Sequence, residues 1–307
     1  MQAGSTLMKR RTFLGSAAAT ALSLRPAMAS EPTPPLLRFG LIADAQYADA
    51  DPWNDRHYRA TPEKLKRAVE TIRAAKPAFT LHLGDLIDRD FKAFGTMLPL
   101  LDGLGHPVHH LLGNHDYDVA DTEKACVVAT LGMPHDYYTF RSAGIRFVML
   151  DTNDLSTYKR PADSPATKSA ADYLKRLEET KAPGAKPWNG GIAEAQLGWL
   201  DRELTAADAA KERVIVCGHH PLIPADMHQA WNFQEILAVL DRHSCVTAYF
   251  NGHNHAGDFV ERKGIPYLTF RSMLHEPQIT AFSIVEVHAD RIVITGHGRE
   301  ESRVLKM

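Results

Sequence analysis

The sequence predicts an α/β fold, in which a sheet is covered on its outside by helices. From Leu36 onward, short apolar runs alternate with segments of helical periodicity, and this alternation is typical of that class. Hydrophobic residues make up 44% and charged residues 23% of the 307 residues, which are ordinary values for a globular chain with a sizeable core. The sequence has no heptads, fixed-period repeats or low-complexity tracts that would indicate another architecture.

The first residues of the chain follow a different pattern. A basic stretch at residues 9–11 precedes an apolar run from Phe13 to Leu24, and Ala27 and Ala29 have the A-x-A spacing of a cleavage site. We interpret residues 1–29 as a twin-arginine-type signal peptide, because the adjacent arginines are followed by Thr-Phe-Leu. This predicts export by the twin-arginine machinery to the periplasm, with no stable membrane span after processing. The alternative is a chance basic tail followed by an alanine-rich helix.

The remaining bulk features narrow the possible partners. Residues 30–36 are proline-rich and predict a linker, which leaves 37–307 as the folded domain. The formal net charge of −2 indicates no general attraction to nucleic acid or to anionic membranes. Three cysteines, Cys126, Cys217 and Cys245, are too few and odd in number for a disulfide framework, although one bridge stays possible.

The elements can be placed in order along the chain. A first strand is expected at residues 36–44, and a helix at 61–76 with Thr61 as its N-cap and Pro62 in its first turn. Further strands are expected at residues 78–85, 107–116, 145–154, 213–221 and 245–255, and further helices at 91–104, 194–204 and 231–243. The tail from Phe259 to Val293 has short alternating runs, which predict antiparallel strands joined by tight turns.

Five of these strands are followed at once by polar side chains that can bind a metal. They are Asp44 and Gln46, then Asp85, then Asn114 with His115, then His219 beside His220, and last His253 and His255. Ligands of α/β sheets collect at the carboxyl ends of strands, so we expect these side chains to converge. A glycine precedes several of them, which we interpret as allowing a sharp turn. A lone aspartate or histidine in such a place is usually structural, but the ordered combination is improbable by chance.

The residue types indicate a particular chemistry. Mixed carboxylate, amide and imidazole ligands suit Mn²⁺, Fe or Zn²⁺ rather than thiolate-bound metals. One carboxylate can bridge two such cations about 3.5–4 Å apart. A metal pair of this kind polarises a phosphoryl oxygen and generates a bridging hydroxide that attacks phosphorus, while a nearby histidine protonates the leaving oxygen.

The motifs D-x-[HQ], GD, GNH[DE], GHHP and GHxH, in this order, resemble the calcineurin-like metallophosphoesterase superfamily over most of the chain after the signal. The resemblance implies a four-layer αββα sandwich with a dimetal site at the carboxyl ends of the strands. It implies two ligand sets that share Asp85 as the bridge, and His115 as the catalytic histidine. The sets are Asp44, Gln46, Asp85 and His255 for one metal, and Asp85, Asn114, His219 and His253 for the other.

Gln46 departs from the usual pattern of the superfamily, which has histidine at this position. The departure resembles one branch, the manganese-dependent ADP-ribose/CDP-alcohol diphosphatases, as do segments outside the metal motifs such as "HYRATPEKLKRAVE" and "NGGIAEAQLGWLD". An amide oxygen is a weaker donor than an imidazole, so the first metal should be held less tightly. The resemblance implies two divalent ions, with Mn²⁺ favoured and Fe or Zn²⁺ as alternatives.

The implied reaction is hydrolysis of the phosphoanhydride of a small nucleotide such as ADP-ribose or a CDP-alcohol, through the metal-bridging hydroxide. Two alternatives stay open: a phosphodiesterase or phosphomonoesterase of the same superfamily, and a metal-binding protein without catalysis. Several aromatic and polar residues flank the motifs and could contact a base or a phosphate, although most are expected to serve packing. These are Tyr47, Trp53, Tyr58, Arg59, Tyr117, Trp231 and Asn232.

Overall fold

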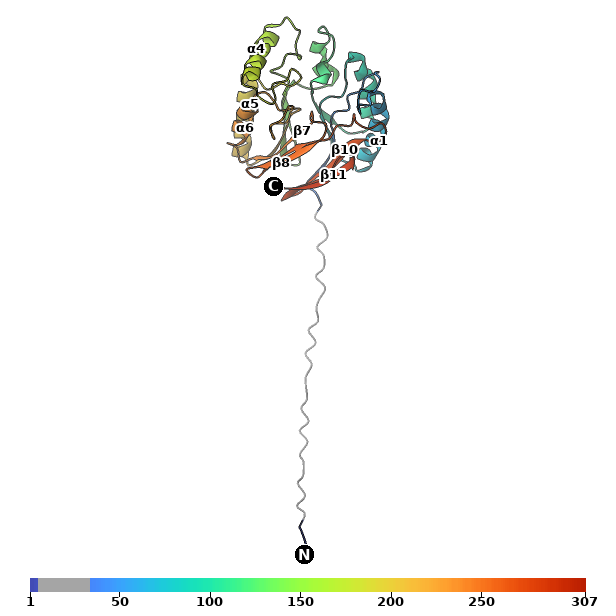
Figure 1. The fold of residues 1–307 in the computed structure, drawn as a ribbon, viewed down its shortest axis with the longest axis vertical. Helices are drawn as coiled ribbons and strands as arrows, with labels where there is room; N and C mark the ends of the chain where they lie inside the picture. Colours follow the sequence, from blue (N-terminus) through green and yellow to red (C-terminus); the bar gives the residue numbers. More distant parts are fainter. Residues whose placement is uncertain (5–33) are drawn as a thin grey trace. The chain divides into compact units, whose positions relative to one another are not determined.

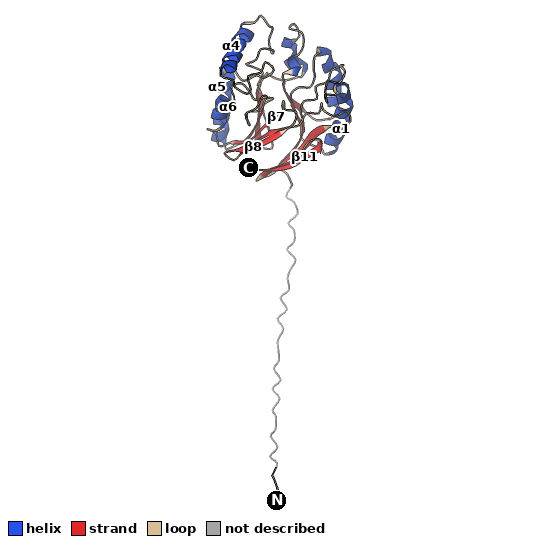
Figure 2. Ribbon diagram, in the orientation of Figure 1, coloured by secondary structure: helices blue, strands red, loops and turns tan. Residues whose placement is uncertain are grey.

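The computed structural model describes residues 1–4 and 34–307, and Pro34 to Met307 form one compact unit. Two sheets lie in the middle of this unit and helices cover its two outer sides, so the layers are helix, sheet, sheet, helix (Figures 1 and 2). The predicted α/β sandwich is therefore confirmed. The predicted signal peptide at 1–29 and linker at 30–36 lie almost entirely outside the described residues. Within the described part of the chain, no helix has the length and apolarity needed to cross a membrane.

The first sheet has six strands, and its parallel half carries three of the predicted strand ends. Its order is β12 (Arg303–Lys306), β11 (Arg291–Gly298), β10 (Ala281–Val287), β1 (Leu37–Ile42), β2 (Thr80–Leu83) and β3 (Val108–Leu111). Strands β1, β2 and β3 run parallel, whereas β10, β11 and β12 are joined to them by antiparallel pairing. The carboxyl ends of β1, β2 and β3 therefore meet at one edge.

The second sheet also has six strands and a parallel centre. Its order is β4 (Tyr138–Ser142), β5 (Ile145–Met149), β6 (Arg213–Cys217), β7 (Val246–Asn251), β9 (Ile265–Thr269) and β8 (Asp258–Arg262). Strands β5, β6, β7 and β9 are parallel, and the two edge strands are antiparallel to their neighbours. The antiparallel pairing predicted for the tail is confirmed for β8–β9 and β10–β11. On its other side, β9 pairs in parallel with β7, which lies outside the tail.

Helices on the outside complete the layers (Figure 1). The helices are α1 (Thr61–Ala74), α2 (Phe94–Asp102), α3 (Val127–Thr130), α4 (Pro165–Glu179), α5 (Glu194–Ala210) and α6 (Phe233–Leu240). Short 3₁₀ turns occur at η1 (Tyr58–Ala60), η2 (Phe91–Ala93), η3 (His115–Tyr117) and η4 (Lys124–Cys126). The predicted N-cap role of Thr61 is wrong, because Thr61 is the first residue of α1 and its hydroxyl donates to the carbonyl oxygen of Tyr58 at 2.9 Å.

Two hydrophobic cores hold the layers together. The larger one joins the facing sides of the two sheets, where the rings of Phe39 and Phe147 meet edge to face at 5.5 Å, and it continues under α1 and α2. The smaller one lies between the second sheet and α5 and α6, and includes Leu200, Leu204 and Ile236. Because both sheets are fixed against each other by buried side chains, the loops at their carboxyl ends are held in place.

Candidate metal centre

All seven predicted ligands lie just beyond the carboxyl ends of strands, and both sheets contribute. Asp44 and Gln46 follow β1, Asp85 follows β2 and Asn114 follows β3, while His219 follows β6 and His253 and His255 follow β7. Ligand atoms of Asp85, His219 and His253 lie within 4.8 Å of one another, and the same is true of Asp44, Asp85 and His255. Asp85 belongs to both groups, which is the arrangement expected of a bridging carboxylate.

Individual distances define the two groups more closely. Oδ2 of Asp85 lies 3.3 Å from Nε2 of His219, and Oδ1 of Asn114 lies 3.2 Å from the same nitrogen. On the other side of Asp85, Nε2 of His255 lies 3.7 Å from Oδ1 of Asp44. Each group thus gathers oxygen and nitrogen donors around one point.

The amide of Gln46 provides a test of whether a cation fits. Its Nε2 lies 2.8 Å from Oδ2 of Asp85 and 3.0 Å from Nε2 of His255, while its Oε1 is buried without a hydrogen-bond partner. A half-turn of the amide exchanges the two atoms and places the oxygen where the carboxylate and the imidazole already point. Three lone-pair donors then face one point, and a cation satisfies all of them.

The backbone at the ligands is unusual. Asp44, Gln46, Asp85 and His253 have φ of 51°, 46°, 56° and 67°, in the left-handed region that residues with a side chain seldom adopt. Such conformations persist only where the surroundings enforce them, and they cluster at functional sites.

The neighbouring glycines mostly serve a purpose other than the predicted sharp turn. Gly84 does have a positive φ, of 91°. Gly113, Gly218 and Gly252 do not; a Cβ on each would overlap the carboxylate of Asp85, the hydroxyl of Tyr249 and the carboxylate of Asp44, respectively. These three glycines are therefore required for close approach, because any side chain would occupy the space of the ligands or of a residue beside them.

Hydrogen bonds fix which nitrogen of each imidazole is available. Nδ1 of His219 donates to the carbonyl oxygen of Leu83 at 2.8 Å, and Nε2 of His253 donates to Oδ1 of Asn189 at 2.7 Å. Nδ1 of His255 lies 2.7 Å from Nε2 of His275. These contacts leave Nε2 of His219, Nδ1 of His253 and Nε2 of His255 free to bind a metal.

Burial and mutual interaction shift the pKa values of the two acidic ligands in opposite directions. Burial raises the pKa of Asp44 to about 7, and the nearby charge of Asp85 adds to this. Burial also works to raise the pKa of Asp85, but His219 and His115 outweigh it and hold that pKa far below the ordinary range. Two fully buried carboxylates that repel each other favour a cation between them.

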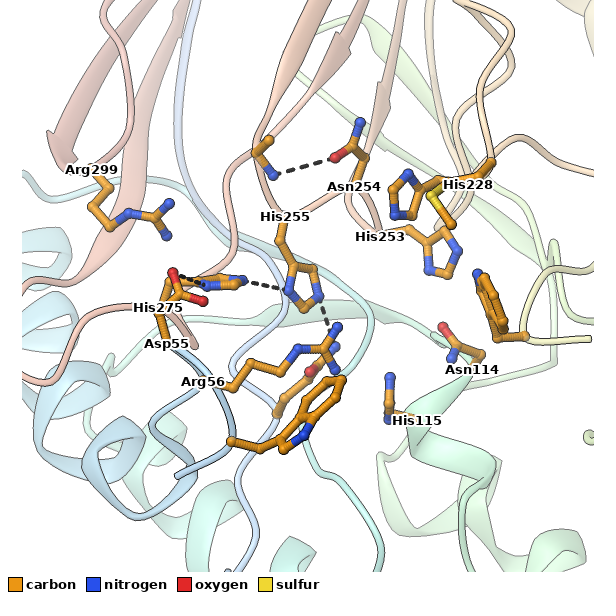
Figure 3. Close-up of a pocket in the computed structure, with 15 residues that line it drawn as sticks. Asp55, Arg56, Asn114, His115, His228, His253, Asn254, His255, His275 and Arg299 are labelled. Atoms are coloured by element: carbon orange, nitrogen blue, oxygen red, sulfur yellow. Dashed lines mark hydrogen bonds and ion pairs between the residues drawn. The ribbon is translucent and has the colours of Figure 1, made fainter. Parts of the chain in front are cut away.

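His115 lies beside the ligands rather than among them. Its main-chain N–H donates to Oδ1 of Asp85 at 2.8 Å, and its Nδ1 lies 3.0 Å from Oδ1 of Asp88. Burial works to lower the pKa of His115, but the charges of Asp85 and Asp88 raise it to about 9. The imidazole lines the cavity next to the candidate ligands (Figure 3).

The centre opens into a cavity of about 640 Å³. Its walls include three large side chains that are notably exposed, namely Trp53 at 58%, Trp188 at 40% and Met227 at 46%, and the two cations Arg56 and Arg299. Of the flanking residues predicted from sequence, Trp53 lines this cavity. The others do not: Tyr58, Tyr117, Trp231 and Asn232 are buried, Tyr47 packs against the core, and Arg59 pairs with Asp49 and Asp51.

Sequence reasoning missed several wall residues, chiefly Arg56, Trp188, His275 and Arg299. Arg56 lies in the same segment as Trp53, so the position of that segment just after the first ligands was a usable signal. Trp188 and His275 come from long loops where no strand end marks them. Arg299 directly follows β11, so that strand end was a second usable signal.

Comparisons with known proteins agree with this geometry. Residues 37–257 match the family model of calcineurin-like phosphoesterases. The chain is 33% identical to a manganese-dependent ADP-ribose/CDP-alcohol diphosphatase from Xenopus tropicalis, over 88% of this chain and 94% of that protein. It is 32% identical to a protein of the same name from Oryza sativa subsp. japonica, over 85% and 91%. Among solved structures, a dimetal phosphatase from Danio rerio superposes with a TM-score of 0.80 at 30% identity, over 89% of this chain and 99% of that chain.

Proposed function

The chain belongs to the calcineurin-like phosphoesterase family and is a metal-dependent phosphohydrolase, and on this premise we propose that it hydrolyses the phosphoanhydride of ADP-ribose or CDP-alcohol nucleotides. The observation that carries the proposal is the convergence of seven strand-end side chains around Asp85, at the floor of a cavity with aromatic walls. Relatives that carry this activity in their names align with about nine tenths of the chain.

The proposed metal centre uses the two groups that share Asp85. Asp44, Gln46 and His255 complete one group, and Asn114, His219 and His253 complete the other. We take Mn²⁺ as the metal because the named relatives are manganese-dependent and because mixed oxygen and nitrogen donors suit it. Two divalent ions held there would polarise phosphoryl oxygens and supply a nucleophilic water at neutral pH.

His115 is proposed as the proton donor. Its Nδ1 is held by Asp88, so Nε2–H is the atom free to meet a substrate oxygen in the cavity. When the bond between phosphorus and the leaving oxygen breaks, that oxygen gains negative charge, and a proton from Nε2 of His115 neutralises it. Asp88 keeps the ring oriented and stabilises its protonated form.

The cavity walls fit a substrate with a base and two phosphates. The exposed faces of Trp53 and Trp188 offer apolar surface on which a purine or pyrimidine can stack. The guanidinium of Arg56 lies 5.4 Å from the ring of Trp53, and Arg299 adds a second positive charge to the same wall. These charges favour a diphosphate over a neutral ligand.

Product analysis tests the proposal. The protein from residue 30 onward is stripped of metal, reloaded with Mn²⁺, Fe²⁺ or Zn²⁺, and incubated with ADP-ribose, CDP-choline, cyclic AMP and bis-p-nitrophenyl phosphate. We expect AMP from ADP-ribose and CMP from CDP-choline, fastest with Mn²⁺, and no release by the Asp85→Asn variant. Cleavage of the diesters without release of AMP or CMP would replace the proposed substrate by a phosphodiester.

We also propose that the chain is exported in folded form through the twin-arginine pathway. The support is the arginine pair at Arg10 and Arg11 followed by an apolar run. Expression in a bacterium with this pathway should place activity in the periplasmic fraction. Replacing both arginines with lysine should retain the protein in the cytoplasm, whereas unchanged periplasmic activity would reject this route.

A further inference from the structure

The three candidate ligand imidazoles differ in the group that is hydrogen-bonded to the ring nitrogen facing away from the metal site. His219 donates to a main-chain carbonyl oxygen and His253 to the side-chain oxygen of Asn189, which are both neutral acceptors. His255 instead contacts a second imidazole, that of His275. Nδ1 of His275 lies 2.8 Å from Oδ2 of Asp55. Figure 3 marks this contact with a dashed line. Among the described residues of the centre, His255 is thus the candidate ligand imidazole that is linked, through a second imidazole, to a carboxylate.

We propose that His275 is a positioning residue for the metal bound by His255, and that with Asp55 it strengthens this ion's binding to offset the weak donor Gln46. The inference rests on the proposed function only in its dimetal centre, and not in its substrate. His275 itself need not touch the metal or the nucleotide, because it acts through His255.

The direction of the hydrogen bonds follows from the site. For Nε2 of His255 to face a cation, its hydrogen must be on Nδ1, which then donates to Nε2 of His275. His275 consequently carries its own hydrogen on Nδ1, the atom that faces Asp55. The 2.8 Å separation there is within hydrogen-bonding distance, although the N–H is not aligned for an ideal hydrogen bond. A carboxylate at the end of such a chain makes the ligand imidazole a better donor.

The chain holds His275 firmly in this position. Nζ of Lys64, a fully buried residue of α1, donates to the carbonyl oxygens of Leu274 at 3.1 Å, His275 at 3.1 Å and Glu276 at 2.8 Å. The main-chain N–H of Leu274 donates to the carbonyl oxygen of Asp44 at 3.2 Å. The loop that carries His275 is therefore tied both to α1 and to a candidate ligand.

The need for such support is specific to one of the two groups. The group of Asn114, His219 and His253 has two imidazoles besides the shared Asp85. The group of Asp44, Gln46 and His255 has one, because an amide stands where an imidazole would donate more strongly. Loss of a partner behind a ligand typically weakens metal affinity by about 10–100-fold. We expect His275 to act within that range, and on this group alone.

Calorimetric titration of the metal-stripped protein with Mn²⁺ tests the proposal, with electron paramagnetic resonance to separate a coupled metal pair from a single ion. His275→Phe keeps the ring volume but removes the acceptor. We expect it to raise the dissociation constant of one Mn²⁺ by about 10–100-fold and to leave the other within about twofold. At one equivalent the spectrum should then be that of a single Mn²⁺. His275→Gln, whose side-chain oxygen can accept from Nδ1 of His255, should restore most of the affinity.

Two further variants complete the experiment. Asp55→Asn should weaken the same ion less than His275→Phe does, because the imidazole stays in place. His228→Phe is the matched control, since His228 lines the same cavity but bonds to Asp226 instead of a candidate ligand. Unchanged binding in His275→Phe, or an equal loss of both ions, would overturn the proposal. If ADP-ribose is not hydrolysed but the one-ion loss is observed, the proposed substrate fails and this inference stands.

Discussion

The space that the shared carboxylate of Asp85 occupies depends on a single residue, Gly113. Asp85 can face both metal groups only because Gly113 has no Cβ, which would occupy the position of the carboxylate oxygen. The same carboxylate accepts from the N–H of His115, so displacing it also disturbs the proposed proton donor. The backbone of Gly113 is not in the left-handed region, so alanine can adopt its conformation. The methyl group of alanine would nevertheless clash with the carboxylate of Asp85.

Gly113→Ala should therefore weaken metal binding without preventing folding. We expect binding of both Mn²⁺ ions to weaken at least tenfold and kcat to fall by about 10²-fold or more, since the displaced carboxylate serves both groups. Metal content by mass spectrometry and steady-state rates measure this. Gly95→Ala is the control, because a Cβ at that exposed helical position meets nothing within 4 Å. Retention of both ions in Gly113→Ala would contradict the bridging role of Asp85.

His115 permits a prediction that separates chemistry from metal binding. His115→Ala should lower kcat by about 10²–10⁴-fold, because the leaving oxygen then departs without a positioned proton donor. Both Mn²⁺ ions should stay bound, since the imidazole of His115 belongs to neither ligand group. Asp88→Asn should have a smaller effect, because the ring remains but its orienting carboxylate is lost. A normal rate in His115→Ala would mean that another group is the acid.

At the scale of elements, the central strands and the edge strand β3 were predictable, whereas the edge strands β4 and β12 were not. Strands β1, β2, β5, β6 and β7 are almost entirely buried, so each appears in the sequence as a mostly apolar run. The edge strands β4 and β12 contain exposed charged residues and were missed. Helix α4 was also missed, although Ser164 caps it and Pro165 opens it, which are signals that the sequence does contain.

The pairing of β2 and β3 buries two histidines away from the metal centre, and this predicts sensitivity to acid. His82 and His110 are paired in register, with their Nδ1 atoms 3.2 Å apart. Burial lowers the pKa of His110 to about 4 and holds the pKa of His82 well below its ordinary value. The unfolded chain therefore binds protons that the folded chain does not, so stability is full above about pH 6.5 and falls as pH decreases below it.

Replacing His82 with leucine removes one of the two groups that bind a proton when the chain unfolds. We expect the midpoint of acid unfolding, followed by circular dichroism, to move to lower pH in His82→Leu. His135→Leu, at an exposed position, is the matched control and should leave the midpoint unchanged. An unaltered midpoint in His82→Leu would show that proton uptake by His82 does not govern acid unfolding.

For the whole molecule, the sequence predicted the candidate ligands but not how the chain divides between the two sheets. Residues after β1, β2 and β3 come from the first sheet and those after β6 and β7 from the second, and neither composition nor periodicity indicates this division. The pairing of β1 with β10 joins segments more than 200 residues apart, such as Gly40 with Ile284. The two-sheet sandwich was predicted only from the resemblance to the superfamily. The cavity walls stayed largely unpredicted, because Trp188 and Met227 lie in long loops and Arg299 lies in the turn between β11 and β12.

The division of ligands between the sheets predicts that the metals stabilise the entire fold. Asp44, Gln46, Asp85 and Asn114 extend from the first sheet, and His219, His253 and His255 from the second, so each ion would link the two sheets. An ion that binds the folded state alone adds about 2.7 kcal/mol at a free concentration 100 times its dissociation constant. For a domain of this size, 1 kcal/mol corresponds to roughly 2–4 °C in Tm. Removing both ions by chelation should thus lower Tm by about 10–20 °C, and added Mn²⁺ should restore it.

Scanning calorimetry of the protein from residue 30 onward measures the change, with Asp85→Asn as the control that should show little response to Mn²⁺. If Asp85→Asn responds as fully as the unmodified protein, the stabilising ions bind elsewhere and do not link the sheets through this centre.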